Sequence, residues 1–587
     1  MKYSKESIQL SADICIIGGG MAGICAAVAA ARHGAQVVLM HDRPVLGGNA
    51  SSEIRMWIRG APGAENRETG ILSEIELLNI YRNPTMNYSL WDSVLYETVT
   101  SEPNIRLLLN CSCLGCEYAD HVIQAVRGWQ LNTYTFFEVA ARQFIDCSGD
   151  SILADLTDAQ TLQGREDHSE FGEPDAEETH DMGVMGSSIL IQARETGQDQ
   201  PFTPPDFAYS YPDDESLHLH THEMTASGSN FWWIELSDGY DTLRDTGGLR
   251  DELLKIAYGV WDHLKNHSDG KYRNWELEWL GFLPGKRETR RYRGAYVLRE
   301  QDLSEGTDFP DVVAFGGWTM DNHNPKGFYF HGYSSRHIPV HVPYGIPLRS
   351  LYSANIHNLL FAGRNISATH LALSSTRVMA TCSLMGQAAS TAAAACIRYS
   401  CSPDEIDRLH IEQVQQWLLD DGCMLPGHRR IPKQCGLMLD PEELAVLTNG
   451  IERPFNGEAN TVSLNEHTVW HIELQAGVHR QLRLALDPDF SRESITDEPA
   501  YRKFALRSHI VKDMKPLKMP ANLLKSCHIV FKTADGDTVY PVSCNHKHIL
   551  WIPIPDSVSA LELRDVQAWN SCETRVFSCD VLPGESD

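Results

Sequence analysis

Hydrophobic and small residues alternate in blocks at the start of the chain. An Ile-rich run at residues 13–17 predicts a short buried strand. An Ala-rich run at 24–33 predicts a helix that Gly34 ends, and a second apolar run at 36–40 predicts another strand. Glycines crowd the stretch between the first strand and the helix. The order strand, Gly-rich turn, helix, strand predicts a βαβ unit.

The glycines of this turn follow the spacing Gly-x-Gly-x-x-Gly at positions 18, 20 and 23. Gly18 allows the tight turn, Gly20 lets the backbone approach a pyrophosphate, and Gly23 lets helix and strand pack closely. The amides of Met21 and Ala22 open the helix, where free N–H groups and the positive dipole end attract phosphates. In this βαβ context the spacing predicts dinucleotide binding.

The residue that would bind the ribose departs from the usual pattern. The second strand of such a unit ends in Asp or Glu, which bonds a ribose hydroxyl. Here that place falls to His41, and Asp42 follows it. Either His41 contacts the ribose or Asp42 does after a small shift. Arg43 comes next, which leaves a 2′-phosphate as a further alternative.

The segment after the second strand carries a resemblance to a known family. Residues 41–53 read His-Asp-Arg-Pro-Val-Leu-Gly-Gly-Asn-Ala-Ser-Ser-Glu. This run resembles the corresponding segment of glutathione-reductase-like flavoproteins and, more closely, of a bacterial branch of FAD-dependent oxidoreductases. The resemblance implies that the paired glycines Gly47 and Gly48, with Asn49, bring the chain beside a flavin.

Two later segments support the resemblance, which covers roughly residues 13–397. Residues 143–150 resemble the second flavin motif, a strand that ends in a small-residue turn beside the dinucleotide. Residues 359–365 resemble the late strand that ends near the ribityl chain. The helix that follows, starting around 375–379, would aim its positive end at a reduced flavin. The cofactor-binding residues that the resemblance implies in these segments are Ser148, Gly149, Asp150, Gly363, Arg364, Thr376, Arg377 and Val378.

The stretch after the paired glycines holds no cysteine between residues 49 and 55. Disulfide-reducing relatives of this fold carry a redox-active pair of cysteines there. Thiol–disulfide chemistry at this place is therefore disfavoured. We expect the flavin to exchange electrons with a substrate directly.

An Arg-rich segment at residues 285–294 lies near the flavin in the family that the chain resembles. Arg287, Arg290 and Arg291 could anchor oxygens of the substrate or cofactor, and Arg291 is the catalytic candidate among them. The alternative is a solvated charged strand or an ion-pair network. The sequence leaves both open.

Two histidines are the candidate acid/base groups. His323 is one because Asp321 could orient its ring. His370 is the other, because it lies between the late flavin strand and the last flavin helix. A neutral imidazole there could accept a hydroxyl proton while hydride leaves for the flavin. The alternative for His370 is a structural role in a loop. The spacing of the neighbouring histidines does not fit a metal site, and no metal is expected.

The C-terminal third predicts a helix at 401–421 and then short alternating strands from about Gly436. The strands indicate a β-sandwich, which could bind carbohydrate or only cover the catalytic half. Trp470, Trp551 and Trp569 could stack on sugars, although core packing explains them as well. The predicted strands are 468–474, 481–486, 528–532 and 548–552.

The expected fold class is α/β: a Rossmann-type FAD-binding domain with an inserted α+β substrate domain and a C-terminal β-sandwich. The length of 587 residues fits several domains. The expected division is 1–160 for the FAD-binding region, 161–350 for the substrate domain, 351–430 for the return to the FAD-binding domain, and 436–587 for the sandwich.

Composition excludes some partners. The net charge of −28, without any Lys/Arg-rich run, disfavours nucleic acid. No apolar stretch is long enough to span a membrane, and residues 1–11 lack the apolar core of a secretory signal. Fifteen scattered cysteines favour a reducing compartment. The chain is therefore expected in the cytoplasm, and the sequence leaves open whether it forms a homo-oligomer.

These observations predict an FAD-dependent oxidoreductase that exchanges a hydride between flavin and a small polar substrate. A sugar or another hydroxy compound is suggested by the aromatic- and His-rich middle segment and the appended sandwich. The alternative is a non-catalytic flavin-binding protein whose β domain binds carbohydrate or a partner. A second Gly-x-Gly-x-x-Gly for NAD(P) is not found.

Overall fold

The computed structural model describes the chain except for residues 1–5, 221–230, 434–435, 475–479, 493–514 and 584–587. The chain forms two compact units, which we describe separately. The first is built from residues 1–61 and 86–414, and the second from 62–85 and most of the chain from 415 onward. The sequence had placed residues 62–85 in the FAD-binding region, whereas the structure groups them with the C-terminal unit.

The first unit is organised around a seven-stranded sheet. Its parallel part follows the order β3-β2-β1-β6-β17, and the antiparallel strands β5 and β4 extend from the first half of β6. Ile17 pairs with Met40 on one side and with Asp146 on the other. These three strands therefore end at one edge, where α/β proteins bind their ligands. The strands are β1 (Glu6–Ile17), β2 (Val37–Met40), β3 (Ile105–Leu108), β4 (Cys111–Ala119), β5 (Val122–Gln130), β6 (Thr135–Asp146) and β17 (Leu359–Phe361).

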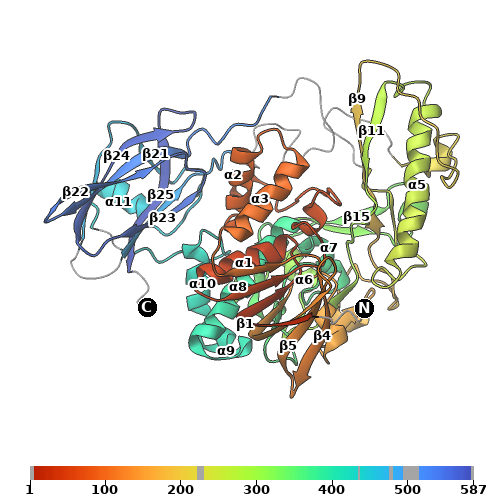
Figure 1. The fold of residues 1–587 in the computed structure, drawn as a ribbon, viewed down its shortest axis with the longest axis horizontal. Coiled ribbons are helices and arrows are strands. Elements are labelled where there is room, and N and C mark those ends of the chain that lie inside the picture. Colours follow the sequence, from red (N-terminus) through yellow and green to blue (C-terminus); the bar gives the residue numbers. More distant parts are fainter. Residues whose placement is uncertain (1–5, 221–230, 434–435, 475–479, 493–514, 584–587) are drawn as a thin grey trace. The chain divides into compact units, whose positions relative to one another are not determined.

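Two buried helices, α1 (Met21–Arg32) and α8 (Met379–Tyr399), pack side by side against this sheet (Figure 1). Alanines and glycines allow the close approach. A Cβ atom at Gly386 of α8 would come within 2.1 Å of the carbonyl oxygen of Ala22 in α1. This packing places the N-termini of both helices near the ligand-binding edge of the sheet. Helix α3 (Tyr88–Thr100) also packs on α1, and the Asn87 side chain caps its first turn.

The region inserted between β6 and β17 is α+β, as expected. It consists of five two-stranded antiparallel pairs, β10–β8, β11–β9, β12–β7, β13–β16 and β14–β15, together with the long helix α5 (Thr246–Asn266). The buried face of α5 packs in a hydrophobic core that includes Trp233, Phe231 and Phe328. The elements are β7 (Thr161–Gln163), α4 (His168–Phe171), β8 (Ser187–Ser188), β9 (Ile191–Glu195), β10 (Glu235–Leu236), β11 (Trp275–Leu280), β12 (Arg290–Tyr292), α6 (Glu300–Glu305), β13 (Val312–Gly316), β14 (Met320–His323), β15 (Ser335–Ile338) and β16 (Tyr344–Pro347).

Two helices predicted as continuous are each broken in the structure. The helix expected after the late strand is divided into α7 (His370–Thr376) and α8 because Val378 adopts an extended conformation and caps α8. The helix expected at 401–421 is divided at His410 into α9 (Pro403–Leu409) and α10 (Ile411–Asp420). The first break matters for the site, because Arg377, which lies between the two helices, lines the cavity described below.

The second unit contains two four-stranded antiparallel sheets, with the strand orders β18-β25-β20-β23 and β19-β24-β21-β22. Each of the four predicted strands has a counterpart, and the Asp535-Gly536 turn joins β21 to β22. Helix α2 (Ile71–Arg82) belongs to this unit. The remaining elements are α11 (Pro441–Leu447), β18 (Val462–Leu464), β19 (Trp470–Glu473), β20 (Arg480–Leu486), β21 (Leu524–Thr533), β22 (Gly536–Val542), β23 (Ile549–Ile554), β24 (Val558–Ala568) and β25 (Thr574–Pro583).

Candidate functional site

A cavity of about 450 Å³ opens at the carboxyl edge of the parallel sheet. Most of the predicted cofactor residues line it, although they come from distant parts of the sequence. Gly23, Thr376 and Val378 are not among the lining residues. Those that do line it are Gly18, Gly20, Met21, Ala22, His41, Asp42, Arg43, Gly47, Gly48, Asn49, Ser148, Gly149, Asp150, Gly363, Arg364 and Arg377.

The three glycines of the first turn have different physical roles. Gly18 has a φ of +102°, and a Cβ there would lie 2.5 Å from the carbonyl carbon of Cys147. A Cβ at Gly23 would lie 1.8 Å from the carbonyl oxygen of Gly18, so this glycine serves packing. At Gly20 the nearest atom to an added Cβ is 3.9 Å away. Gly20 therefore keeps open space beside the N-terminus of α1, where a phosphate group could approach the backbone amides.

His41 holds the turn together. Its Nδ1 accepts a hydrogen bond from the Gly19 amide at 3.0 Å, so the ring proton lies on Nε2, which donates to the Val45 carbonyl at 3.0 Å. Burial lowers the pKa of His41 to about 4. Both ring nitrogens of His41 therefore bond the backbone, whereas the Asp42 side chain is 63% exposed.

Asp146, which the sequence analysis did not single out, organises the second motif. Its carboxylate accepts hydrogen bonds from the Ser148 amide at 2.9 Å, the Tyr292 hydroxyl at 2.6 Å and the Asn365 amide at 3.2 Å. Asp146 is fully buried at the end of β6. It thereby ties the turn at residues 147–150 to the loop after β17. The only sequence signal was its place at the strand end.

Three charged side chains form a cluster on the cavity wall. Asp150 lies 2.7 Å from Lys286 Nζ and 3.1 Å from Arg364 Nη2. Burial alone would raise the pKa of Asp150, but Arg364 and Lys286 outweigh it and hold the pKa below its usual value. The cluster carries one net positive charge. Sequence analysis missed Lys286, although it follows Pro284 in the Arg-rich segment, and it also missed the lining residues Cys111, Ser112, Cys113, Thr246, Leu283 and Met379.

His323 lies beside the cavity in a row of buried charges. Its Nδ1 is 2.8 Å from Glu235 and its Nε2 is 3.2 Å from Asp321, as the sequence analysis expected for Asp321. The carbonyl and carboxylate of Asp321 in turn lie 3.0 and 3.5 Å from Arg377 Nη2. Nδ1 makes a hydrogen bond with Glu235, whereas Nε2 only lies within ion-pair distance of Asp321 and has no hydrogen-bond partner among the described residues. His323 is not among the residues that line the cavity, and its acid/base role stays a prediction.

His370 begins α7 and is 97% buried. Its Nδ1 lies 2.9 Å from Glu288, and its Nε2 lies 2.9 Å from the side-chain oxygen of Asn322. His370 is not among the residues that line the cavity. Both ring nitrogens are therefore engaged by buried side chains from other segments, and the acid/base role of His370 stays a prediction.

The Arg-rich segment forms the ion-pair network that was one of its two interpretations. Arg291 is fully buried, with Nη2 3.2 Å from Glu166 and 2.6 Å from the Gly164 carbonyl. Arg287 lies 2.7 Å from Glu235. Arg290 pairs with Asp155 at 2.5 Å. A buried cation without such partners would destabilise the folded protein, so these ion pairs contribute to the fold. Arg291 is thus revised from a catalytic candidate to a structural one.

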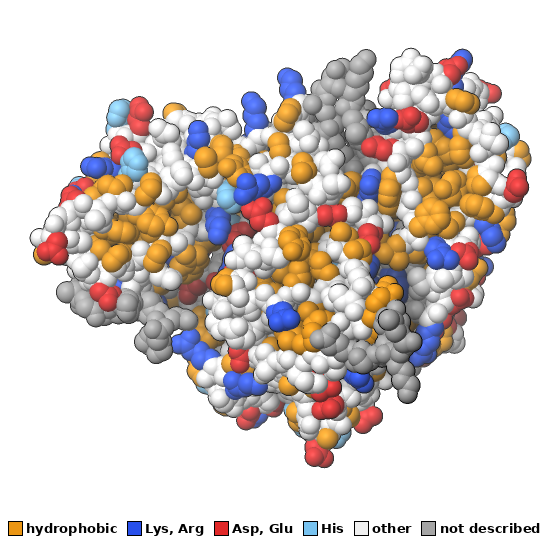
Figure 2. Space-filling view, viewed as in Figure 1, with side chains coloured by type: hydrophobic (Ala, Val, Ile, Leu, Met, Phe, Trp, Pro, Cys, Tyr) orange, Lys and Arg blue, Asp and Glu red, His pale blue; other side chains and the backbone are white. Residues whose placement is uncertain are grey.

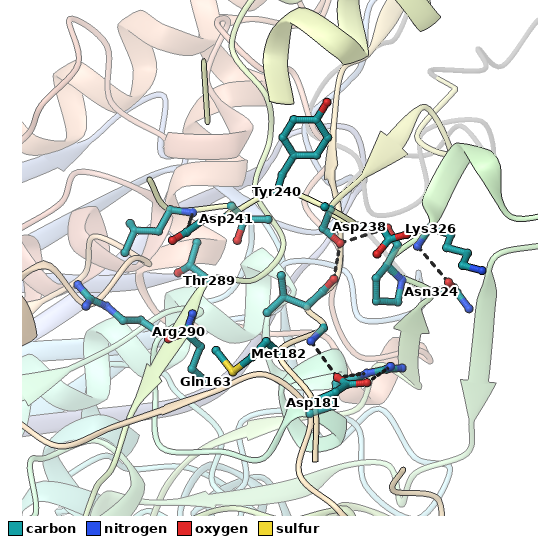
Figure 3. Close-up of a pocket in the computed structure, with 18 residues that line it drawn as sticks. Gln163, Asp181, Met182, Asp238, Tyr240, Asp241, Thr289, Arg290, Asn324 and Lys326 are labelled. Carbon is teal, nitrogen blue, oxygen red and sulfur yellow. Dashed lines mark hydrogen bonds and ion pairs between the residues drawn. The ribbon is translucent and has the colours of Figure 1, made fainter. Parts of the chain in front are cut away.

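A second cavity of about 670 Å³ lies in the inserted region. Figure 3 shows Gln163, Thr289 and Asp241 on one side of it and Asp238 and Asn324 on the other. The Thr289 hydroxyl lies 3.3 Å from both the Gly149 carbonyl and the Asp150 carboxylate. The wall of this polar cavity therefore adjoins the first cavity at Asp150.

Other ligand classes find little support in the part of the chain that the structure describes. No group of three or more His, Cys, Asp or Glu side chains there could hold a metal ion. No described helix is long and apolar enough to cross a membrane. On the face drawn in Figure 2, the coloured Lys and Arg side chains are interspersed with Asp and Glu and form no continuous basic area.

Comparison with known proteins identifies the family. A family model described as FAD dependent oxidoreductase matches residues 13–418, more than half of the chain. The chain belongs to this family. The protein is an FAD-dependent oxidoreductase, and its cofactor is FAD. The matched residues span the large sheet, the inserted region and helix α8. No curated protein matches the sequence.

Solved structures with similar chains are distant. A geranylgeranyl bacteriochlorophyll reductase-like protein from Thermoplasma acidophilum is 12% identical, with 70% of this chain and 86% of that chain covered and a TM-score of 0.30. The OxyS anhydrotetracycline hydroxylase from Streptomyces rimosus is 10% identical, with 69% and 66% covered and a TM-score of 0.31. L-proline dehydrogenase from P. horikoshii is 20% identical, but only 28% of this chain and 26% of that chain are covered, at a TM-score of 0.16. Scores this low carry no argument about substrate.

The first cavity fits FAD on three observations. Gly20 leaves open space at the N-terminus of α1. Arg364 Nη1 is buried without a hydrogen-bond partner among the described residues. Cationic side chains outnumber carboxylates on the lining, where Arg43, Lys286, Arg364 and Arg377 face Asp42 and Asp150. A diphosphate and a flavin would supply the missing acceptors and negative charge.

Proposed function

We propose that this FAD-dependent oxidoreductase exchanges a hydride between FAD in the 450 Å³ cavity and a small polar substrate. Hydroxy compounds, including sugars and hydroxy acids, are the first class to test. The observation that carries the proposal is the open space at Gly20 directly beside the first amides of α1. A bulky residue at this position would have filled the space that a diphosphate needs.

The residues that would hold FAD follow from their places on the lining. Amides at the start of α1 would bind the diphosphate, since they face the cavity and carry the positive end of the helix dipole. Asp42 would bind a ribose hydroxyl, because His41 is engaged with the backbone. Lys286 and Arg364 would neutralise diphosphate or ribityl oxygens beside Asp150. Bound FAD supplies the hydride chemistry itself.

The rest of the site would orient groups and place charge. Arg377 and the N-terminus of α8 bring positive charge to the cavity, and this charge would stabilise negative charge on a bound reactant. His323 and His370 hold Asp321 and Glu288 in place. A polar substrate is supported by the many uncharged and charged hydrogen-bonding groups on both cavities and by their shared boundary at Asp150 and Thr289.

The test is anaerobic bleaching of the flavin. Purified protein loaded with FAD would be mixed with individual sugars, polyols and hydroxy acids, and absorbance near the flavin maximum would be followed. The proposal expects at least one hydroxy compound to bleach the flavin rapidly and to be recovered as its carbonyl product. Protein that is bleached by dithionite but by no member of the panel would contradict the substrate class and favour the alternative of a non-catalytic flavin-binding protein.

A further inference from the structure

Arg377 occupies a special place in the fold. It stands between the end of α7 and Val378, the extended residue that caps α8, and its side chain lines the cavity. The side chain is only 11% exposed. Its Nε is buried without a hydrogen-bond partner among the described residues. A guanidinium in such a place is costly to bury, and its position must be fixed by neighbouring groups.

A row of buried side chains provides that fixation. Asp321 contacts Arg377 through both its carbonyl and its carboxylate, at 3.0 and 3.5 Å. His323 lies 3.2 Å from Asp321 and 2.8 Å from Glu235, and Arg287 lies 2.7 Å from the far side of Glu235. Arg287 is itself anchored to the Gly186 carbonyl at 2.9 Å. The row therefore connects the core of the inserted region to the edge of the cavity.

The geometry of β14 explains how the row is built. Asp321 and His323 are two apart on this strand, so their side chains share one face, while Asn322 points to the other and meets His370. Ser335, on the paired strand β15, also bonds the Asp321 carboxylate. His337 is a further titratable neighbour, 3.7 Å from Asp321 and 44% exposed, and Arg59 and Tyr333 also interact electrostatically with Asp321. His323, Ser335 and His337 therefore contact Asp321 in addition to Arg377.

We propose that Asp321 is a positioning residue that fixes the Arg377 guanidinium at the flavin cavity, and that this positive charge raises the reduction potential of bound FAD. The reduced flavin gains negative charge, so a cation held nearby stabilises it relative to the oxidised form. Burial lowers the pKa of Arg377 to about 10, which leaves the guanidinium charged at neutral pH. The inference rests on the proposed binding of FAD in this cavity.

The direction in which each substitution shifts the reduction potential distinguishes a positioning role of Asp321 from a direct effect of its charge. Arg377→Met removes the cation and should lower the equilibrium constant for flavin reduction about tenfold, or about 30 mV for a two-electron couple. Asp321→Asn removes a negative charge, which by itself would favour reduction. If Asp321 acts by holding Arg377, however, its loss releases the guanidinium, and the potential should fall in the otherwise unchanged protein.

The experiment is a double-mutant cycle on the holoenzyme. The potential of bound FAD is measured by equilibration with a reference dye for the unchanged protein, Arg377→Met, Asp321→Asn and the double variant. We expect Asp321→Asn to lower the equilibrium constant about tenfold when Arg377 is present and to leave it unchanged or raised when Arg377 is absent. Equal shifts in both backgrounds, or a rise in both, would overturn the positioning role.

Two controls keep the result interpretable. Asp311→Asn is the matched control, because Asp311 is a buried carboxylate paired with Arg349 at 2.9 Å but does not line the cavity. Its potential should equal that of the unchanged protein. If Asp321→Asn yields no holoenzyme, Glu235→Gln tests the row two contacts away from Asp321 and should lower the potential by a smaller factor; an unchanged potential there would contradict the proposal. The dye titration needs no substrate, so failure of the proposed hydroxy-compound activity remains distinguishable from failure of this inference.

Discussion

The turn at the start of α1 and the row of charges beside α7 are both part of one flavoprotein unit, but they achieve their geometry in different ways. The turn uses backbone: Gly18, Gly20 and Gly23 create a close contact, an open space and a second close contact within six residues. The charged region uses side chains from separate segments, so that His323 meets Glu235 and His370 meets Glu288. The first is local in sequence and the second is not.

This difference separates two kinds of function. The glycine turn leaves backbone donors exposed to a ligand, whereas the buried charged groups mainly contact one another, although atoms such as Arg377 Nε have no hydrogen-bond partner among the described residues. Substitutions in the glycine turn should therefore weaken FAD binding. Substitutions among the charged groups should instead lower the stability of the protein or change the properties of FAD that is still bound.

The largest expected effect is on stability in the charged region. Arg291→Met would leave Glu166 buried without its cation and would remove the 3.8 Å contact with Glu288, which keeps its contact with His370, and it should cost about 3–5 kcal/mol. Thermal denaturation followed by tryptophan fluorescence should show a midpoint about 5 °C lower. Arg250→Met is the control, since Arg250 is 43% exposed in its pair with Asp251 and its loss should have little effect. A stable Arg291→Met protein with a raised KM would instead restore Arg291 as a substrate anchor.

The next effect is on FAD binding at the turn. Gly20→Val should lower FAD affinity at least about 100-fold, because the side chain enters the space left for the diphosphate, and an added Cβ there meets no protein atom closer than 3.9 Å. Equilibrium dialysis with FAD measures the change. Gly197→Val is matched to it, because an added Cβ at Gly197 meets nothing within 4 Å and the residue does not line the cavity. If both variants bind FAD normally, the diphosphate does not lie at Gly20.

His41 gives the turn a pH dependence. Its folded pKa of about 4 lies below the unfolded value of about 6.5, so the unfolded chain binds a proton first. Stability contributed by neutral His41 is full above pH 6.5 and is lost progressively as the pH falls towards 4, by about 2 kcal/mol at pH 5. His41→Asn, which keeps an acceptor for the Gly19 amide, should lose less stability between pH 7 and pH 5.

The comparison between the two proteins isolates His41, since His548, whose pKa burial also lowers to about 4, is present in both. Chemical unfolding at the two pH values provides the measurement. Identical losses in the unchanged protein and in His41→Asn would show that the imidazole is not held neutral by the turn.

The smallest expected effect concerns the wall of the cavity. Arg364→Met should weaken FAD binding about tenfold, because it removes a cation whose Nη1 lacks a partner in the cavity wall. The affinity is measured by quenching of FAD fluorescence. Arg408→Met, which breaks an exposed pair with Asp404, should leave the affinity unchanged. Equal affinities for all three proteins would remove Arg364 from the FAD site.

The sequence predicted most of the first region, and the reason is physical. A tight turn, a close helix contact and a parallel strand each require particular residue types within a few positions of one another. The roles of Gly18, Gly20 and Gly23 could therefore be assigned from their spacing alone. The strands at 13–17 and 36–40 were found for the same reason, whereas the late strand within 359–365 was expected from the family resemblance. His41 was the exception, because its two backbone partners become visible only when the turn is folded.

Most contacts in the charged region could not be predicted, because the sequence around a histidine does not indicate which distant residues its ring will contact. The sequence offered Asp321 as a partner of His323 and left a structural role open for His370, but Glu235 and Glu288 reach these rings from other segments and were not foreseen. Asp146 and Lys286 were overlooked because single polar residues at strand ends and in loops are common. The Arg-rich segment had two interpretations, and only the burial of Arg291 with Glu166 decided between them.

The most direct test of the FAD site is a titration of cofactor-free protein with FAD, followed by absorbance and by separation of free from bound cofactor. The cavity geometry predicts uptake of one FAD per chain, a yellow protein, and loss of that uptake in Gly20→Val but not in Gly197→Val. A chain that folds normally yet stays colourless with excess FAD would contradict the account at its foundation.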